Sequence, residues 1–351
     1  YLGKFGYTPV FVLEHIREKC TKKIAVMLNE KSTKSTDLPN LLAPIKGLTD
    51  MVRLAIDPKN IDRAIVLAKA VKDMGFEVGF NMMYMSKWSE MDGFLPKLKA
   101  IDGIADLFCM VDSFGGITPQ EVKRILAEVR QYTNVPIGFH GHNNLQLGLI
   151  NALTAIENGI DYVDATITGM GRGAGNLNME LLLTYLNKHD GLEVDFNVLG
   201  DVITAFAPLK EKYGWGTNLP YMLSGANNIP QKEVMEWVTN RVYSFNSIVR
   251  ALDNRKNNAK DNARFPIFEP MHKFDNVIVV GGGTNALEHQ EAIKTFIASK
   301  PNTTMVFATA RNAQSYLDID VPKYYCLVGN EGHRLTANVG ANYFKCTCIL
   351  P

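Results

Sequence analysis

The sequence predicts an α/β protein whose larger part is a (β/α)8 barrel. From residue 10 to about residue 188, short apolar runs alternate with stretches of helical periodicity. Such alternation is typical of parallel strands joined by right-handed helical crossovers. A doubly wound open sheet would show the same alternation, but no Gly-rich dinucleotide loop follows any of the six apolar runs. We therefore favour the barrel.

Six apolar runs of strand length carry this prediction. They span residues 23–28, 50–56, 77–82, 106–111, 136–140 and 162–168. Helices are expected between them at residues 60–74, 118–132 and 145–158. The second of these helices has a clear start, because Thr118 is a good N-cap, Pro119 suits the first turn and Glu121 completes a capping box. Six units over about 180 residues fit most of a barrel, which typically takes about 250 residues.

Two further regions with different predicted secondary structure follow the barrel. We predict a partial barrel over residues 1–188, a helical lid or dimer region over 189–262, and an incomplete Rossmann-like domain over 263–351. Helices are expected in the second region at about 195–213, 231–241 and 245–258, and strands in the third at 274–280, 304–308 and 324–328. Gly281, Gly282 and Gly283 follow the first of those strands, with a helix expected at 286–298. This turn lacks the G-x-G-x-x-G spacing and the Walker lysine, so nucleotide binding and a plain tight turn both stay open.

Composition excludes several classes of function. The chain has 351 residues, a net charge of +1 and 46% hydrophobic residues. A nearly neutral net charge gives no reason to expect binding to nucleic acid or to an anionic membrane. No apolar run approaches the ~20 residues that span a bilayer. Five cysteines, an odd and low number, suit a reducing cytoplasm. The sequence begins in a loop-like stretch and stops at Pro351, directly after a strand-like run, so we expect an internal piece of a longer protein.

Two histidines mark the predicted site. His140 and His142 follow the apolar run at 136–140. Residues i and i+2 of a strand point to the same face, so both imidazoles would project together from the carboxyl end of one strand. Two imidazoles on one face supply two of the ligands of a typical divalent-metal site. One packed or surface histidine is the alternative for a lone pair of this kind.

Polar residues at the other strand ends would share that face if the fold is a barrel. They are Asn29, Glu30, Asp57, Asn81, Asp112, Ser113 and Thr168. Asp57 precedes Pro58 and is expected to cap a turn, whereas Asp112 and Ser113 precede two glycines and are expected to contact a ligand. Alternating glycines at 169–175 would present backbone N–H groups to an anionic oxygen. Within that loop, Arg172 adds a fork for a carboxylate.

These motifs together resemble the metal-dependent aldolase and lyase barrels. That family includes 4-hydroxy-2-oxovalerate aldolase, hydroxymethylglutaryl-CoA lyase and the isopropylmalate and homocitrate synthases. The resemblance spans roughly residues 1–225 and is closest to the 4-hydroxy-2-oxovalerate aldolase type. It is carried by the segments His140-x-His142-Asn143-Asn144-Leu145, Gly169-Met170-Gly171-x-Gly173-Ala174-Gly175-Asn176, Asp161-x-Val163-Asp164-Ala165 and Val111-Asp112-Ser113.

The resemblance implies a role for each matching residue. His140 and His142 would be metal ligands, and Asn176 a ligand or a close neighbour of the metal. Asp112 and Ser113 would face the substrate, with Ser113 also a candidate catalytic group. Gly171 and Arg172 are expected to contact the substrate because of the loop chemistry described above, not because of the resemblance. Tyr221 would be the catalytic acid or base that some relatives place there, or a packing aromatic. Asn143 and Asn144 are candidates to hydrogen-bond the two imidazoles.

One departure from the family pattern matters. The family's third ligand is an aspartate in an Asp-Arg-Glu or Asp-Arg-Asp motif on the first barrel strand, and this sequence has no such segment. The resemblance therefore implies that the chain carries strands three to eight, that its metal site is incomplete, and that the piece alone is inactive.

The implied activity is cleavage of a 4-hydroxy-2-oxo acid to pyruvate and an aldehyde with Mn²⁺ or Mg²⁺, Co²⁺ and Zn²⁺ being possible. A cytoplasmic homo-oligomer acting on a small 2-oxo acid, without nucleic acid or membrane, is expected. Two alternatives stay open. An acyl-CoA condensing synthase of the isopropylmalate type would have aspartate where this chain has Asn144. A non-catalytic barrel would serve as a scaffold fused to a nucleotide-binding domain.

Overall fold

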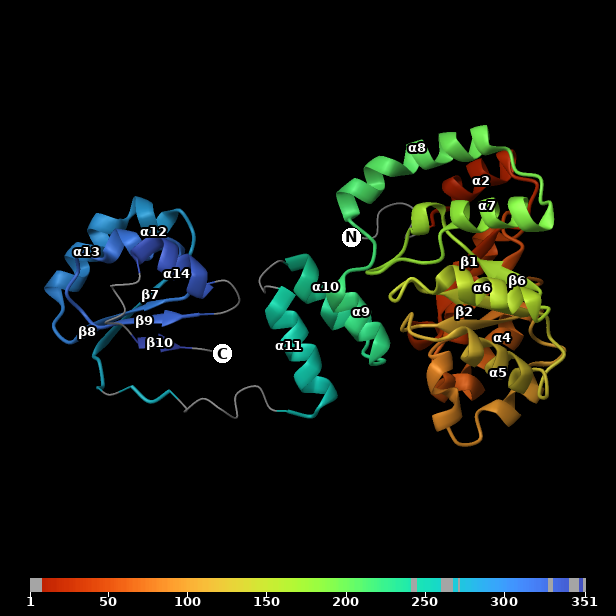
Figure 1. Ribbon diagram of the computed structural model, residues 1–351, viewed down its shortest axis with the longest axis horizontal. Helices are drawn as coiled ribbons and strands as arrows, with labels where there is room; N and C mark the ends of the chain where they lie inside the picture. The colour runs from red at the N-terminus through yellow and green to blue at the C-terminus, as the bar shows by residue number, and fades with distance from the viewer. Residues whose placement is uncertain are drawn as a thin grey trace. The chain divides into compact units, whose positions relative to one another are not determined.

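The computed structural model describes residues 8–240, 245–259, 268–270, 272–327, 331–340 and 347–349. The chain forms two compact units that divide between Gln231 and Lys232. The first unit is built on a six-stranded sheet and the second on a four-stranded sheet (Figure 1). The division into three regions at 188 and 262 stays a prediction. In the described part of the chain, no helix combines the length and apolar character needed to cross a membrane.

The six strands of the first unit follow one another around the sheet in chain order. They are β1 (Ala25–Asn29), β2 (Met51–Ile56), β3 (Glu77–Met82), β4 (Leu107–Asp112), β5 (Ile137–Gly141) and β6 (Tyr162–Asp164). Each strand pairs in parallel with the next. A doubly wound sheet would reverse its strand order at a switch point, and this sheet does not. The predicted α/β barrel class is confirmed.

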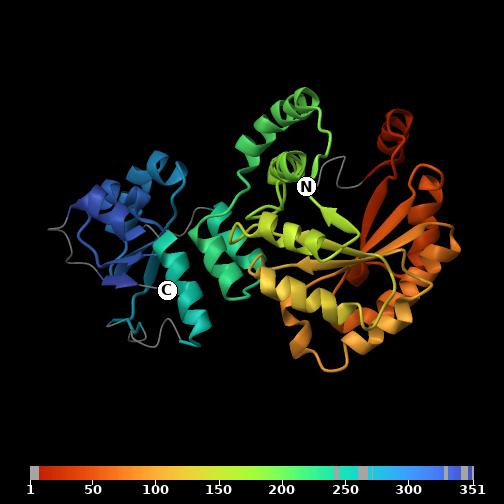
Figure 2. The same cartoon turned by 45° about the vertical axis from the view of Figure 1, so that its right-hand side comes forward.

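Helices cover one face of this sheet (Figure 2). The three longest that connect consecutive strands are α4 (Ile61–Asp73), α5 (Pro119–Val129) and α6 (Gly148–Glu157). The strand side chains that face them are fully buried and apolar; they include Leu54, Phe80, Phe108, Met110 and Phe139. Because side chains alternate along a strand, the intervening positions face the barrel interior, and several of those are polar.

Local signals explain where these helices begin. The Thr118 hydroxyl accepts from the Glu121 amide at 3.4 Å, and the Glu121 carboxylate accepts from the Thr118 amide at 2.8 Å. This confirms the predicted capping box. Asp57 accepts from the Lys59 amide at 3.1 Å, which confirms its capping role. α6 begins three residues later than predicted because Gln146 has a left-handed φ of 59° that no helix interior adopts.

Further helices complete the first unit. They are α2 (Val10–Lys19), α3 (Leu38–Leu42), α7 (Met179–Asp190), α8 (Phe196–Tyr213), α9 (Leu219–Ala226), and the 3-10 helices η1 (Glu30–Ser32), η2 (Ser35–Asp37), η3 (Ala43–Ile45), η4 (Pro58–Asn60), η5 (Met85–Glu90), η6 (Leu95–Ile101) and η7 (Ile167–Gly169).

β6 is shorter than predicted. It ends at Asp164, although the apolar run reaches residue 168. The chain leaves the sheet because Thr166 pairs with Asn178 instead of a β5 residue, and because Thr168 adopts a left-handed φ of 53°. The Gly-rich loop is thereby folded back over the strand ends.

The second unit is a parallel α/β structure. Its strands are β7 (Asn276–Val280), β8 (Thr303–Phe307), β9 (Lys323–Cys326) and β10 (Thr347–Ile349), and they lie in the order β10-β9-β8-β7. Its helices are α10 (Gln231–Asn240), α11 (Phe245–Lys256), α12 (Asn285–Glu288), α13 (Gln290–Ser299), the 3-10 helix η9 (Ala310–Tyr316) and α14 (Glu331–Val339). α10 begins at the division between the two units. The predicted helix at 286–298 is divided at His289, and α14 was not predicted, whereas β10 matches the strand-like run directly before Pro351. The Asn312 amide donates to the carbonyls of Gly281 and Gly283 at 2.9 Å, which anchors this turn on η9. Nucleotide binding by Gly281, Gly282 and Gly283 stays a prediction.

Candidate active site

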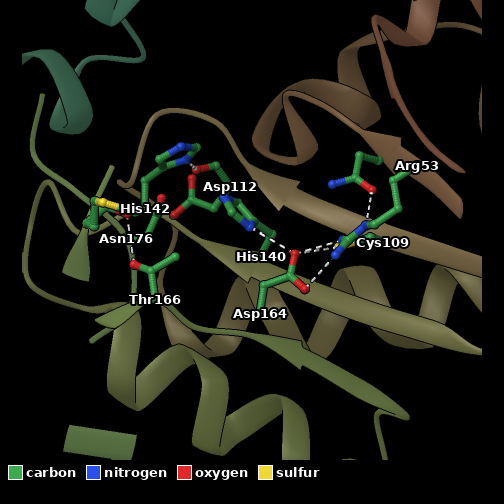
Figure 3. A network of polar contacts seen from close by, with 10 residues as sticks. Arg53, Cys109, Asp112, His140, His142, Asp164, Thr166 and Asn176 are labelled. Atoms are coloured by element: carbon green, nitrogen blue, oxygen red, sulfur yellow. Dashed lines mark hydrogen bonds and ion pairs between the residues drawn. The ribbon is translucent and has the colours of Figure 1, made fainter. Parts of the chain in front are cut away.

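The two histidines lie together at the carboxyl end of the barrel sheet. His140 is near the end of β5 and His142 follows it directly. Their ring centroids are 5.0 Å apart and their planes are inclined at 77° (Figure 3). His142 also forms an isolated antiparallel bridge with Asn176, which brings the Gly-rich loop beside the pair. The structure therefore brings together three residues that were predicted as metal ligands.

Each imidazole has a fixed partner at Nδ1. His140 Nδ1 lies 3.0 Å from the Asp164 carboxylate, and His142 Nδ1 lies 2.7 Å from the backbone carbonyl of Asp112. A carbonyl and a carboxylate both accept, so Nδ1 carries the proton in each ring and Nε2 keeps a lone pair. This is the arrangement in which histidines bind metals through Nε2.

The expectation that Asn143 and Asn144 hydrogen-bond the imidazoles was wrong, because the partners are Asp164 and the Asp112 carbonyl. Asn143 Oδ1 accepts from the Gly148 amide at 3.2 Å, at the first turn of α6. Asn144 is fully buried, and its Nδ2 donates to the Tyr221 carbonyl at 2.9 Å. Both side chains therefore brace neighbouring helices instead of the imidazoles. Asn144 in particular holds α9 against the barrel.

Asn144→Asp is expected to lower the free energy of unfolding by about 3 kcal/mol, because a buried carboxylate would lack the N–H that Nδ2 now offers. Urea unfolding at pH 7 measures the effect. Asn143→Asp is the matched control, since its role is to accept from an amide and a carboxylate keeps that role. We expect the control to stay within about 0.5 kcal/mol of wild type. Equal losses in the two variants would contradict the role given to Asn144.

Asp112 and Ser113 accept hydrogen bonds from backbone amides of nearby loops. The Asp112 carboxylate is 1% exposed and accepts the amides of Gly115 at 2.9 Å and Ile117 at 3.3 Å. Burial raises its pKa to about 6, against the effect of these amides. The Ser113 hydroxyl accepts from the Tyr84 amide at 2.8 Å. The contacts assign Asp112 a loop-bracing role, whereas the Ser113 proton is left to donate elsewhere.

The Gly-rich loop places Arg172 and Asn176 beside the histidines. Asn176 Nδ2 donates to the Met170 carbonyl at 2.9 Å. A Cβ on Gly171 would lie 2.7 Å from that amide nitrogen, so any larger residue would displace the Asn176 side chain. Arg172 is exposed, and its charge is near enough to contribute to lowering the pKa of His142.

His142 is neutral in the folded protein at ordinary pH. Burial lowers its pKa to about 4, with smaller effects from His140 and Arg172 in the same direction, and the Asp112 carbonyl opposes them. The unfolded chain binds this proton near pH 6.5. Folding stability contributed by the neutral ring is therefore complete above pH 6.5 and is lost as pH falls towards 4.

We expect acidification from pH 7 to pH 5 to lower the free energy of unfolding of the EDTA-treated protein by about 2 kcal/mol through His142 alone. Urea unfolding of wild type and His142→Gln at both values isolates this contribution, because other titrating groups are common to the two proteins. An equal pH dependence in wild type and variant would contradict the lowered pKa.

The donor chemistry fits two positions of a divalent-metal site. Two imidazoles, oriented through Nδ1, are typical ligands of Mn²⁺, Co²⁺ and Zn²⁺. Among the described residues, no third His, Cys, Asp or Glu joins them in a group able to hold an ion. The aspartate expected on an upstream strand stays a prediction.

Sequence reasoning missed Arg53, which lies inside the barrel. Arg53 on β2 contacts Asp164 through both carboxylate oxygens, and its Nε donates to Asn81. Burial raises the pKa of Asp164, but hydrogen bonds from His140 and Arg53 outweigh it and hold that pKa well below the usual range. The sequence did contain a signal, because a charged residue within an otherwise apolar central strand is almost always paired with an opposite charge.

α9 lies against the loops that follow β4 and β5, beside this site. Tyr221 on α9 is 5% exposed, and burial raises the pKa of its hydroxyl. Gly116 in the loop after β4 approaches Gly225 on α9 so closely that a Cβ on Gly116 would lie 2.3 Å from the Gly225 carbonyl oxygen. The Thr217 hydroxyl donates to the Asn144 carbonyl at 2.6 Å. The structure thus brings Tyr221 to the same end of the barrel as the histidines.

Comparisons with known proteins point to one family. A family model described as HMGL-like matches residues 51–202. Curated relatives named 4-hydroxy-2-oxovalerate aldolase include one from Thermomicrobium roseum, 34% identical over 200 residues, which are 54% of this chain and 55% of the relative. Another, from Pelotomaculum thermopropionicum, is 38% identical over 143 residues, 40% of this chain and 42% of the relative. The chain spans about half the length of the curated relatives it matches.

Solved structures agree with this family. The N-terminal domain of a provisionally assigned aldolase from Bacteroides vulgatus is 78% identical, with a TM-score of 0.68, and the match covers 72% of this chain and 83% of that one. Rhizobium etli pyruvate carboxylase is 17% identical with a TM-score of 0.57, over 70% of this chain and 27% of that one. The second likeness concerns the fold alone.

Proposed function

Because this chain belongs to the HMGL-like family, we propose that it carries most of the active site of a divalent-metal-dependent aldolase. The enzyme would cleave a 4-hydroxy-2-oxo acid to pyruvate and an aldehyde, or join them in reverse. The observation that carries the proposal is the pair His140 and His142, each with Nδ1 engaged and Nε2 open. The name shared by the curated relatives supports the substrate class.

The histidines would hold Mn²⁺ or Mg²⁺, with Co²⁺ and Zn²⁺ as chemically acceptable substitutes. The Asn176 amide oxygen is the further donor that this chain offers beside them. When bound, the cation polarises the 2-keto oxygen and stabilises the negative charge that develops there as the C–C bond breaks.

The substrate is oriented by the loops at the same face. Arg172 offers a two-pronged donor to the substrate carboxylate. Gly171 keeps the backbone open beside it, and the Ser113 hydroxyl is a further donor. These residues fix which end of the 2-oxo acid lies against the histidines.

Tyr221 is the proton donor in this scheme. Its raised pKa keeps the phenol protonated at neutral pH, which suits an acid better than a base. A base takes the 4-hydroxyl proton, and cleavage of the C3–C4 bond releases the aldehyde and leaves the electron pair on C3. The Tyr221 proton converts that carbon to the methyl group of pyruvate, and the tyrosinate regains a proton from solvent. We further propose a homo-oligomer in the cytoplasm; the low, odd number of cysteines supports the compartment.

Pyruvate release tests the proposal. The full-length gene product is assayed with Mn²⁺ and a panel of 4-hydroxy-2-oxo acids that differ in the aldehyde portion, with an EDTA-treated sample beside it. We expect pyruvate and aldehyde in equal amounts, only with metal. A folded protein that releases no pyruvate, but frees coenzyme A from acetyl-CoA and a 2-oxo acid, would replace the aldolase with the condensing synthase.

A further inference from the structure

An ion pair crosses the barrel interior below His140. Arg53 Nη1 and Nη2 donate to the two oxygens of Asp164 at 2.8 Å and 2.7 Å, and Arg53 Nε donates to Asn81 Oδ1 at 2.7 Å (Figure 3). Arg53 belongs to β2 and Asp164 to β6, so three strands lie between them in the sheet. The Asp164 oxygen bound by Nη2 is also the one 3.0 Å from His140 Nδ1.

The interior is shaped to admit this arginine. Gly79 is the register partner of Arg53 on the neighbouring strand, and a Cβ there would lie 2.9 Å from Arg53 Cγ. Gly138 occupies an interior position on β5, where a Cβ would meet Leu107 at 3.2 Å and Cys109 at 3.4 Å. Barrel interiors are usually filled by layers of branched side chains. Here small residues leave a passage for the guanidinium to reach Asp164.

Stability alone does not explain such a pair. The Arg53 and Asp164 side chains are only 16% and 24% exposed. Removing two charges from water costs several kcal/mol per ion, and apolar replacements of a buried pair are often as stable or more so. A two-pronged contact does fix geometry, because it determines both the position and the rotation of the carboxylate.

We propose that Arg53, acting through Asp164, is a positioning residue for His140. This inference rests on the proposed function, in which His140 binds the metal. Arg53 holds Asp164 with one oxygen towards His140 Nδ1, and that contact sets the tautomer and the ring rotation that aim Nε2 at the metal position. Outer partners of metal-binding histidines act in this way, and their loss typically weakens metal binding by about 10–100-fold.

Variants of Arg53 separate positioning from charge. Arg53→Lys keeps the positive charge but cannot bind both oxygens in the same plane, and Arg53→Met removes the charge. Gly79→Ala leaves every charge in place and displaces Arg53 by contact, and it serves if Arg53→Met fails to fold. Arg17→Met is the matched control, because Arg17 also binds a carboxylate, Asp50, at 2.5 Å, but before β2 rather than in the interior.

Two measurements on the full-length gene product decide the proposal. The first is Mn²⁺ affinity from electron paramagnetic resonance. The second is the ¹⁵N NMR spectrum of His140 in the metal-free protein, which reports which ring nitrogen carries the proton. We expect Arg53→Lys, Arg53→Met and Gly79→Ala to weaken Mn²⁺ binding by about 10–100-fold and to mix the two tautomers, with Arg17→Met unchanged in both.

Full affinity and a single Nδ1–H tautomer in Arg53→Lys would overturn the proposal, because charge alone would then suffice. Unchanged spectra in Arg53→Met and Gly79→Ala would overturn it as well. Failure of the proposed function is distinguishable, since a wild-type protein that binds no Mn²⁺ would refute the metal site, while the His140 spectrum would still decide whether Arg53 sets the tautomer.

Discussion

His140→Ala is expected to lower metal-dependent pyruvate release by at least about 10³-fold. The lone pair at His140 Nε2 is one of two imidazole donors that the chain brings together, and alanine offers none. The Lewis-acid contribution of a catalytic cation is worth several kcal/mol, and about 4 kcal/mol corresponds to a 10³-fold change in rate. Removal of the ring also leaves the Asp164 oxygen that now faces it without that partner.

The kcat of the full-length protein at saturating Mn²⁺ measures this effect. Saturation matters because weaker binding alone can be overcome by more metal, whereas a misplaced cation cannot. His15→Ala is the control, since His15 lies on α2 with a side chain that is 66% exposed. Retention of more than about a tenth of the activity by His140→Ala would remove His140 from the metal site.

Gly116→Ala is expected to reduce both stability and activity. A Cβ at this position would lie 2.3 Å from the Gly225 carbonyl oxygen and 2.8 Å from the Gly225 carbonyl carbon. Both are backbone atoms of α9, so a side-chain rotation cannot relieve the contact and α9 must move. Overpacking of this kind costs about 1–3 kcal/mol, and a displacement of about 1 Å near reacting groups can cost about 100-fold in rate.

Urea unfolding and kcat on the same preparations separate the two effects of Gly116→Ala. Gly200→Ala is a suitable control, because a Cβ there meets nothing within 4 Å and the residue lies within α8. That control is expected to gain about 0.5–1 kcal/mol in stability and to keep its activity. Full activity in Gly116→Ala would show that the position of α9, and of Tyr221 on it, does not matter to the reaction.

The parts of the fold that could be predicted from sequence are those set by local patterns. Alternation of apolar runs and helical periods predicted all six barrel strands, and the spacing of His140 and His142 placed both rings on one strand end. The end of β6 was not predictable in this way. Its last apolar residues leave the sheet because Thr166 pairs with Asn178, twelve residues further on, and strand propensity carries no information about that pairing.

The hydrogen-bond partners of the histidines were beyond sequence reasoning for a different reason. Asn143 and Asn144 are near in sequence, whereas the partner of His140 is Asp164, 24 residues away. The contact between Arg53 and Asp164 spans 111 residues and exists only once the strands enclose an interior. Asn144, in turn, is used to hold α9, whose docking no local pattern indicates.

The segment from His140 to Asn144 connects the two histidines to α9. Its first residue is His140, the proposed metal ligand. Its last residue, Asn144, contacts the Tyr221 carbonyl on α9 and the hydroxyl of Thr217, two residues before α9 begins. Five consecutive residues therefore join the proposed ligand His140 to α9. If His140 binds the metal as proposed, any effect of the position of α9 on the free energy of ion binding must be matched by an equal effect of ion binding on the position of α9.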